Sequence, residues 1–162
     1  MSGTVPERRV GLADFAVARE GLIVTMGLGS CVAIVLHDAT ARVGAMAHVL
    51  LPDPALSRDG ENPAKFPSTA VPLLISEMRR LGAGAGTTAR LVGGASMFRS
   101  ILASAGLNIG ERNVLAARRA LEAAGVSLVG EDVGGEHGRS VFLDVRTGSV
   151  IVRSLRGGDH EL

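Results

Sequence analysis

Two apolar runs separated by a short polar stretch constrain the fold of this chain more than any other feature. Residues 32–37 and 43–51 are rich in Val, Ile, Leu and Ala, and the residues between them are polar and turn-forming. This pattern is typical of an antiparallel β-hairpin. With a loop at residues 38–41, the register predicts that Cys31 stands directly opposite His48. A bulge, or a Cys31 that precedes the strand, is the alternative geometry.

The only cysteine of the chain and this histidine form a chemically useful pair. Directly opposed residues point to one face of a sheet, with Cβ atoms about 4.5–5.5 Å apart. A neighbouring imidazole can take the proton of a thiol to give the nucleophilic thiolate, and a third group orients such a base. Thr25 is the best local candidate for this third group. Cys31, His48 and Thr25 are therefore the candidate active site, with a buried structural cysteine as the alternative.

A glycine-rich turn precedes the cysteine. Gly27, Gly29 and Ser30 stand between a predicted strand at residues 22–26 and Cys31. Glycine lets backbone N–H groups approach a substrate closely, as an oxyanion hole requires. We therefore expect backbone N–H groups near Ser30 and Cys31 to hold an oxyanion. A plain turn between two strands is the alternative.

The rest of the chain mixes helical and strand patterns. Residues 9–20 predict a first strand or an irregular arm. Residues 52–67 hold four prolines and predict a long loop, either a wall or lid of the site or a surface loop. Helices are predicted from Ser68 or Thr69 to Gly82, over residues 96–105, and over residues 110–124 up to Gly125. Further strands are predicted at residues 90–92, 127–133, 141–145 and 149–153.

Composition narrows the class of protein. A chain of 162 residues that is 46% hydrophobic, with a net charge of +1, suits one globular domain over residues 1–162. Balanced charge and the absence of Trp and Tyr argue against a nucleic-acid partner. A single cysteine excludes an internal disulfide and is typical of a reducing compartment. No segment resembles a signal peptide or a membrane span, so we expect a cytoplasmic protein without membrane insertion.

A metal site is not expected. Cys31, His37 and His48 are the nearest candidate ligands, but on one strand His37 would lie roughly 20 Å from Cys31. The proposed chemistry of a thiol and an imidazole requires no metal and no organic cofactor.

Six short motifs follow one another along the chain. They are Met26-Gly27-Leu28-Gly29-Ser30-Cys31-Val32-Ala33, Met46-Ala47-His48, Lys65-Phe66-Pro67 with Ala70-Val71-Pro72-Leu73-Leu74, Gly93-Gly94-Ala95-Ser96-Met97-Phe98, Ile109-Gly110-Glu111-Arg112-Asn113 and Glu131-Asp132-Val133-Gly134-Gly135. In this order, over about residues 22–153, they resemble the CheD family, the chemoreceptor glutamine deamidases of bacterial chemotaxis. One such motif is weak, whereas six in sequence are specific.

The resemblance implies a fold and a site. The fold is α+β in three layers, with helices packed on one side of mixed β-sheets in a β-sandwich-like arrangement, related to cysteine-dependent toxin deamidases. Matched to the motifs of the family, Cys31 is the nucleophile, His48 the general base and acid, and Thr25 the residue that orients the histidine. Gly27, Gly29 and Phe98 are expected to contact the substrate.

The resemblance also implies a substrate and partners. Glutamine side chains on the long cytoplasmic helices of chemoreceptors would be hydrolysed to glutamate with release of ammonia, and a CheC-type phosphatase is a common partner in the family. The alternative is a non-catalytic adaptor that binds receptors or a CheC-type phosphatase and keeps Cys31 for packing.

Overall fold

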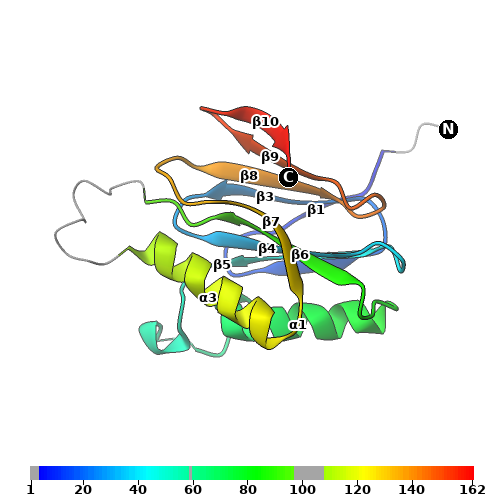
Figure 1. The fold of residues 1–162 in the computed structure, drawn as a ribbon, viewed down its shortest axis with the longest axis horizontal. Coiled ribbons are helices and arrows are strands. Elements are labelled where there is room, and N and C mark those ends of the chain that lie inside the picture. Colours follow the sequence, from blue (N-terminus) through cyan, green and yellow to red (C-terminus); the bar gives the residue numbers. More distant parts are fainter. Residues whose placement is uncertain (1–3, 59, 97–107) are drawn as a thin grey trace.

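The computed structural model describes residues 4–58, 60–96 and 108–162. Within these residues the chain forms three layers, namely two five-stranded β-sheets and two helices that cover one of them (Figure 1). The prediction of an α+β fold with helices on one side of mixed sheets is confirmed. The predicted helix over residues 96–105 falls almost wholly outside the described residues.

The two sheets are both mixed. The outer sheet has the order β1 (Glu7–Arg9), β3 (Leu22–Leu28), β8 (Arg139–Asp144), β9 (Val150–Ser154) and β10 (Gly158–Glu161). The central sheet has the order β2 (Phe15–Ala18), β5 (Val43–Val49), β4 (Val32–Asp38), β6 (Thr87–Gly93) and β7 (Ser127–Val133). The pairs β1/β3 and β6/β7 are parallel, and the other pairs are antiparallel. Residues 9–20, where the sequence predicts a strand or an irregular arm, contribute Arg9 to β1 of the outer sheet and residues 15–18 to β2 of the central sheet.

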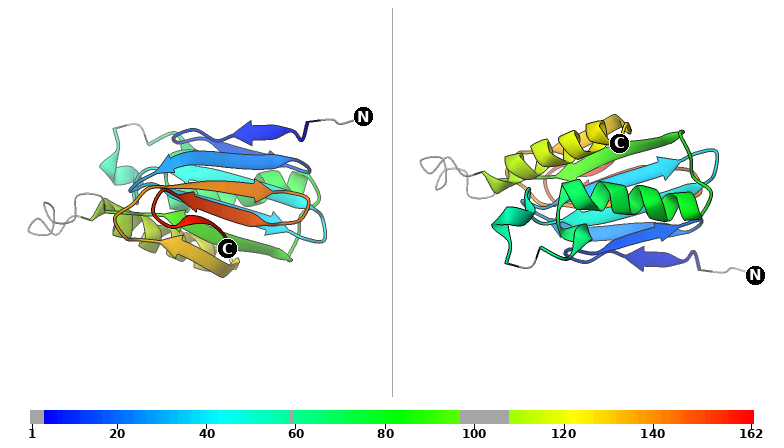
Figure 2. Two further views of the ribbon diagram at one scale, coloured as in Figure 1. Left: turned by 90° about the horizontal axis from the view of Figure 1, so that it is seen from above. Right: turned by 90° about the horizontal axis from the view of Figure 1, so that it is seen from below.

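In the central sheet, strands β4 and β5 are buried on both faces. Its helix-facing side packs against α1 (Pro67–Arg80) and α3 (Ile109–Ala123), which lie along it as Figure 2 shows from below. Its other side packs against the outer sheet in a second apolar core. Every residue of β4 and β5 is consequently buried, which explains why these strands read as nearly continuous apolar runs in the sequence.

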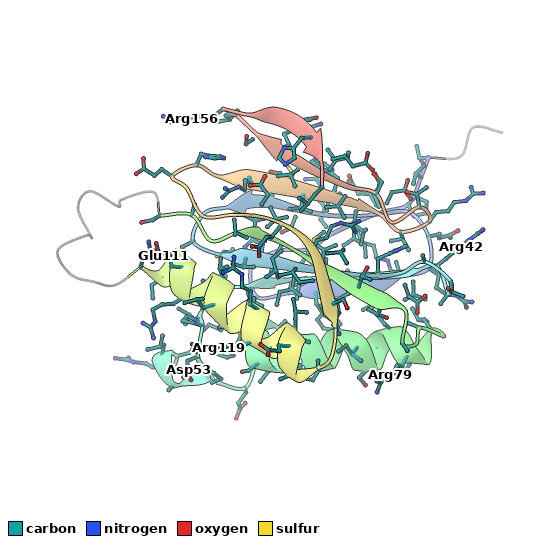
Figure 3. The ribbon with its side chains drawn as sticks, in the orientation of Figure 1. Arg42, Asp53, Arg79, Glu111, Arg119 and Arg156 are labelled. Carbon is teal, nitrogen blue, oxygen red and sulfur yellow. The ribbon has the colours of Figure 1, made fainter. Side chains whose placement is uncertain are left out.

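Charged side chains lie around the outside of this arrangement. The six that Figure 3 labels are all exposed, and they are Arg42, Asp53, Arg79, Glu111, Arg119 and Arg156. Burying an unpaired charge is costly, so the space between the layers is left to apolar side chains and to a few hydrogen-bonded polar ones. Those buried polar groups are the ones that need a functional or structural explanation.

The helices begin and end close to the predicted positions. α3 is capped by the side chain of Asn108, which accepts a hydrogen bond from the backbone N–H of Glu111. α1 begins earlier than predicted, at Pro67, and Phe66 occupies the capping position without a side-chain hydrogen bond. The prediction of Ser68 or Thr69 as its cap is wrong, because the prolines and the buried Phe66 ring fix where the helix enters.

The hairpin of β4 and β5 exists, but its predicted register is wrong by two residues. His48 stands opposite Ala33, and the loop begins after Asp38. The Asp38 carboxylate accepts hydrogen bonds from the backbone N–H groups of Thr40, Ala41 and the distant Gly84. These contacts keep Asp38 in the strand and move the loop one residue along the chain. A shift of two residues conserves the side-chain alternation, so Cys31 stays on the face of His48.

Candidate active site

Thr25 and His48 meet between the two sheets. Thr25 comes from β3 of the outer sheet and His48 from β5 of the central sheet, and each side chain is only 1% exposed. The Thr25 Oγ1 lies 2.7 Å from the His48 Nδ1. These two candidate residues are therefore in direct contact in the fold, while their catalytic roles stay a prediction.

The hydrogen bonds of Thr25 fix the form of the imidazole. The Thr25 hydroxyl donates its proton to the Val10 carbonyl oxygen at 2.7 Å. The same oxygen must then accept from His48, which places the ring proton on Nδ1. The Nε2 of the neutral ring is left with a lone pair, and this buried atom has no hydrogen-bond partner among the described residues. His48 is thus held in the tautomer that can accept a proton at Nε2.

The backbone of His48 is held as firmly as its ring. Its N–H donates to the Asp14 carbonyl at 3.1 Å, and its carbonyl accepts from the Ala13 N–H at 3.0 Å. Ala13 adopts a φ of 56°, a conformation that is uncommon for a residue with a side chain. The Asn62 side chain donates to the Ala13 carbonyl at 2.9 Å. Two segments far apart in the sequence therefore stabilise the position of the histidine.

The loop after His48 is attached to this arrangement. The backbone N–H groups of Leu50 and Leu51 donate to the Lys65 carbonyl. Two short 3₁₀ helices, Pro54–Leu56 and Pro63–Lys65, are the regular structure within its described residues. Its position beside His48 is consistent with a wall of the site, which stays a prediction.

Cys31 immediately precedes β4 in a closely packed turn, which is the alternative geometry considered from the sequence. Its carbonyl accepts from the Gly94 N–H at 2.8 Å. Gly93 has a φ of 114°, and a Cβ atom there would overlap the Cys31 carbonyl oxygen. Cys31 itself is partly exposed and packs at the edge of the core between the sheets. Cys31 precedes Ala33, the strand partner of His48, by two residues, so side-chain alternation puts Cys31 on the face of His48. Among the described residues, however, no hydrogen bond joins the Cys31 sulfur to the His48 ring.

Burial keeps both groups neutral in the resting protein. It raises the pKa of the Cys31 thiol above its ordinary value, an effect that its own backbone N–H partly offsets. It lowers the pKa of the His48 imidazole. The resting pair is accordingly a thiol and a neutral imidazole rather than an ion pair, so proton transfer has to accompany attack on a substrate.

The glycines of the turn have different surroundings. Gly27 lies in an irregularity of the pairing between β3 and β8, with a φ of 67° and open space where a Cβ would be. The Gly29 carbonyl accepts from the Ala95 N–H at 2.8 Å. Ser30 is exposed, beside the partly exposed Cys31. Phe98 lies outside the described residues.

Two groups of this site were not predicted from the sequence. The first is the Val10 carbonyl, a backbone atom that no side-chain pattern can reveal. The second is Asn113, which is fully buried on α3 and donates to the carbonyls of Ser30 and Leu50. Asn113 shares the apolar side of its helix with Val114 and Ala117. A polar residue in such a position is the sequence pattern that could have indicated its role.

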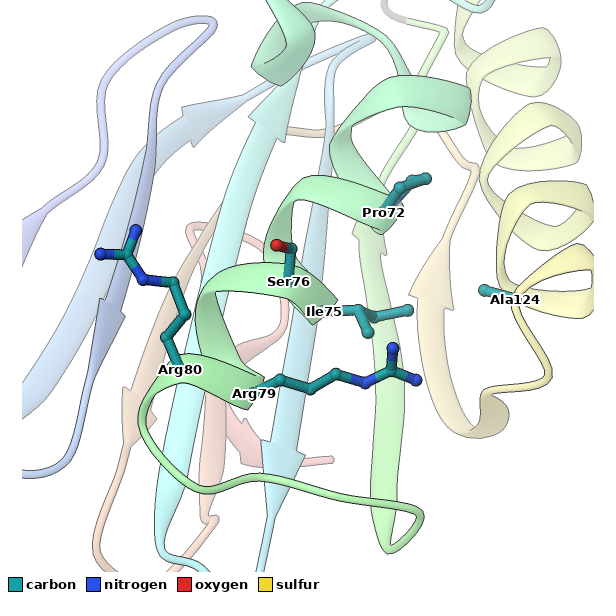
Figure 4. Close-up of a pocket in the computed structure, with 6 residues that line it drawn as sticks. All are labelled: Pro72, Ile75, Ser76, Arg79, Arg80 and Ala124. Carbon is teal, nitrogen blue, oxygen red and sulfur yellow. The ribbon is translucent and has the colours of Figure 1, made fainter.

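Other features of the fold lie away from these residues. His37 bonds through Nε2 to the Val145 carbonyl at 2.8 Å. Across the described ranges, no group of three or more His, Cys, Asp or Glu side chains is placed to hold a metal ion. A surface pocket of about 640 Å³ lies on the helical layer (Figure 4). Its lining is Pro72, Ile75, Ser76, Arg79, Arg80 and Ala124, and it includes none of the candidate catalytic residues.

Comparison with known proteins gives a consistent result. The family model described as "CheD chemotactic sensory transduction" matches residues 50–154. A protein of Thermotoga maritima named "Chemoreceptor glutamine deamidase CheD" is 45% identical over 152 residues, which cover 93% of both chains. A protein of Pyrococcus abyssi named "Probable chemoreceptor glutamine deamidase CheD" is 47% identical over 154 residues, or 94% of both chains. None of the helices in the described part of the chain could span a membrane.

Proposed function

Because this chain belongs to the CheD family, we propose that it deamidates glutamine side chains of chemoreceptors to glutamate, with Cys31, His48 and Thr25 as its catalytic residues. The names of its relatives support the reaction and the substrate class. The observation that supports the site most strongly is the buried His48 Nε2, an acceptor that has no partner among the described residues and lies on the face of the sheet that also carries Cys31.

The first half of the reaction is acyl transfer. His48 accepts the thiol proton of Cys31 at Nε2 as the sulfur attacks the carboxamide carbon of the glutamine. The C–N bond then breaks, the imidazolium returns this proton to the leaving nitrogen, and ammonia departs. Throughout, Thr25 keeps the other ring proton on Nδ1 and holds the ring in place. The product is a thioester between Cys31 and the side chain of the substrate.

The second half is hydrolysis. His48 removes a proton from water as the water oxygen attacks the thioester carbon, and the C–S bond breaks to leave a glutamate side chain. The Cys31 sulfur takes up the proton, so that the resting thiol and neutral imidazole are restored. Neither half needs a metal or an organic cofactor, because one acid–base group serves every proton transfer.

Charge develops on the carbonyl oxygen in both halves. Backbone N–H groups at Ser30 and Cys31 are the proposed donors to this oxyanion. The backbone N–H of Cys31 lowers the pKa of its own thiol and so favours the negative form of the sulfur. Gly27, which is exposed, Gly29 and Phe98 are the proposed substrate contacts.

The substrate class sets the remaining proposals. The glutamines lie on the long cytoplasmic helices of receptors, so we place the enzyme in the cytoplasm and treat residues 1–162 as one deamidase domain. A CheC-type phosphatase is the proposed regulatory partner. A relation to cysteine-dependent toxin deamidases is part of the proposal, because hydrolysis of a glutamine side chain by a thiol would be common to both.

The direct test uses purified chemoreceptor cytoplasmic fragments. Incubation with the protein, followed by peptide mass spectrometry, should show conversion of particular Gln residues to Glu with release of ammonia. The Cys31→Ala variant should bind the fragment and leave its glutamines unchanged. Conversion by Cys31→Ala at the rate of the unmodified protein would overturn the proposed site. A Cys31→Ala variant that signals normally in a chemotaxis assay would favour the adaptor alternative.

A further inference from the structure

Asn113 is a buried polar residue that the proposed reaction does not use directly. It lies in the second turn of α3, is 0% exposed, and neither caps the helix nor contacts a charged group among the described residues. Its Nδ2 donates at 2.9 Å to the Ser30 carbonyl and at 3.0 Å to the Leu50 carbonyl. One side chain thus joins the residue immediately before Cys31 to a residue just after His48.

The bond to Ser30 also sets the direction of the next peptide N–H. A trans peptide is planar, and its C=O and N–H point in opposite directions. With the Ser30 carbonyl turned toward Asn113, the Cys31 N–H points away from α3. Asn113 therefore sets the orientation of the Cys31 N–H, which is one of the proposed oxyanion donors.

The Asn113 Oδ1 is buried without a hydrogen-bond partner among the described residues. A buried polar atom without a partner destabilises a fold, and a leucine at this position would avoid it. A leucine would instead leave the Ser30 and Leu50 carbonyls without the donors they now have. The two N–H groups are therefore what favours asparagine at this position.

Close packing brings α3 to the cysteine turn. A Cβ on Gly110, in the first turn of α3, would overlap the Gly94 and Ala95 carbonyl oxygens. A Cβ on Gly94 would overlap the Val114 side chain. The backbone at Gly94 and Ala95 in turn donates to the carbonyls of Cys31 and Gly29. Helix, glycine segment and turn therefore form one closely packed unit, and Asn113 bonds the helix to the turn at Ser30.

We propose that Asn113 is a positioning residue that fixes the cysteine turn relative to the histidine strand. It acts through the Ser30 and Leu50 carbonyls and touches no reacting atom. The proposal rests on the proposed Cys31–His48 site. A displacement of about 1 Å at a reacting group can cost about 100-fold in rate, so loss of the Asn113 donors should reduce kcat by about that factor at an unchanged KM.

The test compares Asn113→Asp with Asn108→Ala. Asn113→Asp keeps the size of the side chain and removes the paired donors. Asn108→Ala removes the cap of the same helix and is the matched control for helix stability. Each variant is measured by circular dichroism melting, by deamidation of a receptor fragment, and by the rate at which iodoacetamide alkylates Cys31, at a temperature where the variant is folded.

The expected result separates the two variants. Asn108→Ala should lower Tm and keep kcat and the alkylation rate, whereas Asn113→Asp should lower kcat about 100-fold at unchanged KM and change the alkylation rate. A kcat within threefold of the unmodified protein would overturn the proposal, as would failure of both Asn113→Asp and Asn113→Ser to fold. Alkylation needs no deamidation, so Asn113 can be judged even if Cys31→Ala shows that the proposed function is wrong.

Discussion

The hydroxyl of Thr25 can be removed with almost no change in side-chain shape. In Thr25→Val a methyl group replaces Oγ1, so the Val10 carbonyl loses its donor and His48 Nδ1–H loses its acceptor. Thr25→Ser is the matched control because it keeps the hydroxyl and loses only a methyl group. The pair of variants separates the hydrogen bonds of Thr25 from its packing.

The magnitude follows from the two bonds. Both are 2.7 Å long and buried. A buried hydrogen bond contributes about 1 kcal/mol, and leaving its partner unpaired adds to the loss, so Thr25→Val should reduce the free energy of unfolding by about 2–4 kcal/mol. Loss of about 1.4 kcal/mol of preference for the Nδ1–H tautomer is a tenfold change in the ratio of the two ring tautomers. We therefore expect kcat to fall at least about tenfold, with further loss from ring disorder.

Three measurements test this reasoning. Urea unfolding gives the free energy, deamidation of a receptor fragment gives kcat, and ¹⁵N chemical shifts of the histidine ring give the tautomer of His48. Thr25→Ser should keep the Nδ1–H tautomer and most of the activity. If Thr25→Val has a kcat within about twofold of Thr25→Ser, the role of Thr25 in orienting His48 is refuted.

Three further predictions concern the groups around this pair. Burial lowers the pKa of His48, so between its ordinary value of 6.5 and its lower folded value the unfolded state binds more protons, and stability falls with falling pH. The urea midpoint should therefore drop more between about pH 8 and about pH 5.5 in the unmodified protein than in His48→Gln, and equal drops would contradict the account. Burial raises the pKa of the Cys31 thiol from its ordinary value of 9.0. The rate at which iodoacetamide alkylates Cys31 should therefore still be rising with pH at pH 9.0. A rate that levels off below neutral pH would instead indicate a resting ion pair of thiolate and imidazolium. Gly93→Ala should lower kcat and stability more than Gly134→Ala. Both positions have positive φ, which costs a residue with a side chain roughly 1–2 kcal/mol, but only the Cβ at position 93 would also meet the Cys31 carbonyl. Comparable losses in the two variants would show that strain, and not displacement of the turn, is responsible.

The sequence predicted the local parts of the site and missed the distant ones. The apolar runs predicted the hairpin, and alternation placed Cys31 and His48 on one face even though the register was wrong. The register depends on Asp38, whose carboxylate accepts a hydrogen bond from Gly84, a residue of another connection. A local pattern does not contain that contact.

The same limit applies to the groups that hold the histidine. Thr25 could be proposed because it carries a hydroxyl and lies close to Cys31 in the chain. The Val10 carbonyl could not, since every residue has one and only the folded pairing of the arm with β3 brings it to Thr25. The left-handed conformation of Ala13 was equally hidden, because alanine carries no signal for a positive φ.

The central claim is that the Cys31 sulfur forms a thioester with the substrate after giving its proton to His48. Rapid acid quenching of the protein with a receptor fragment, followed by intact-mass and peptide mass spectrometry, tests it most directly. The account predicts a covalent species with the combined mass less one ammonia, mapped to Cys31, that is absent in Cys31→Ala and much reduced in His48→Gln. Conversion of Gln to Glu without such a species in the unmodified protein, and at an equal rate in Cys31→Ala, would contradict it.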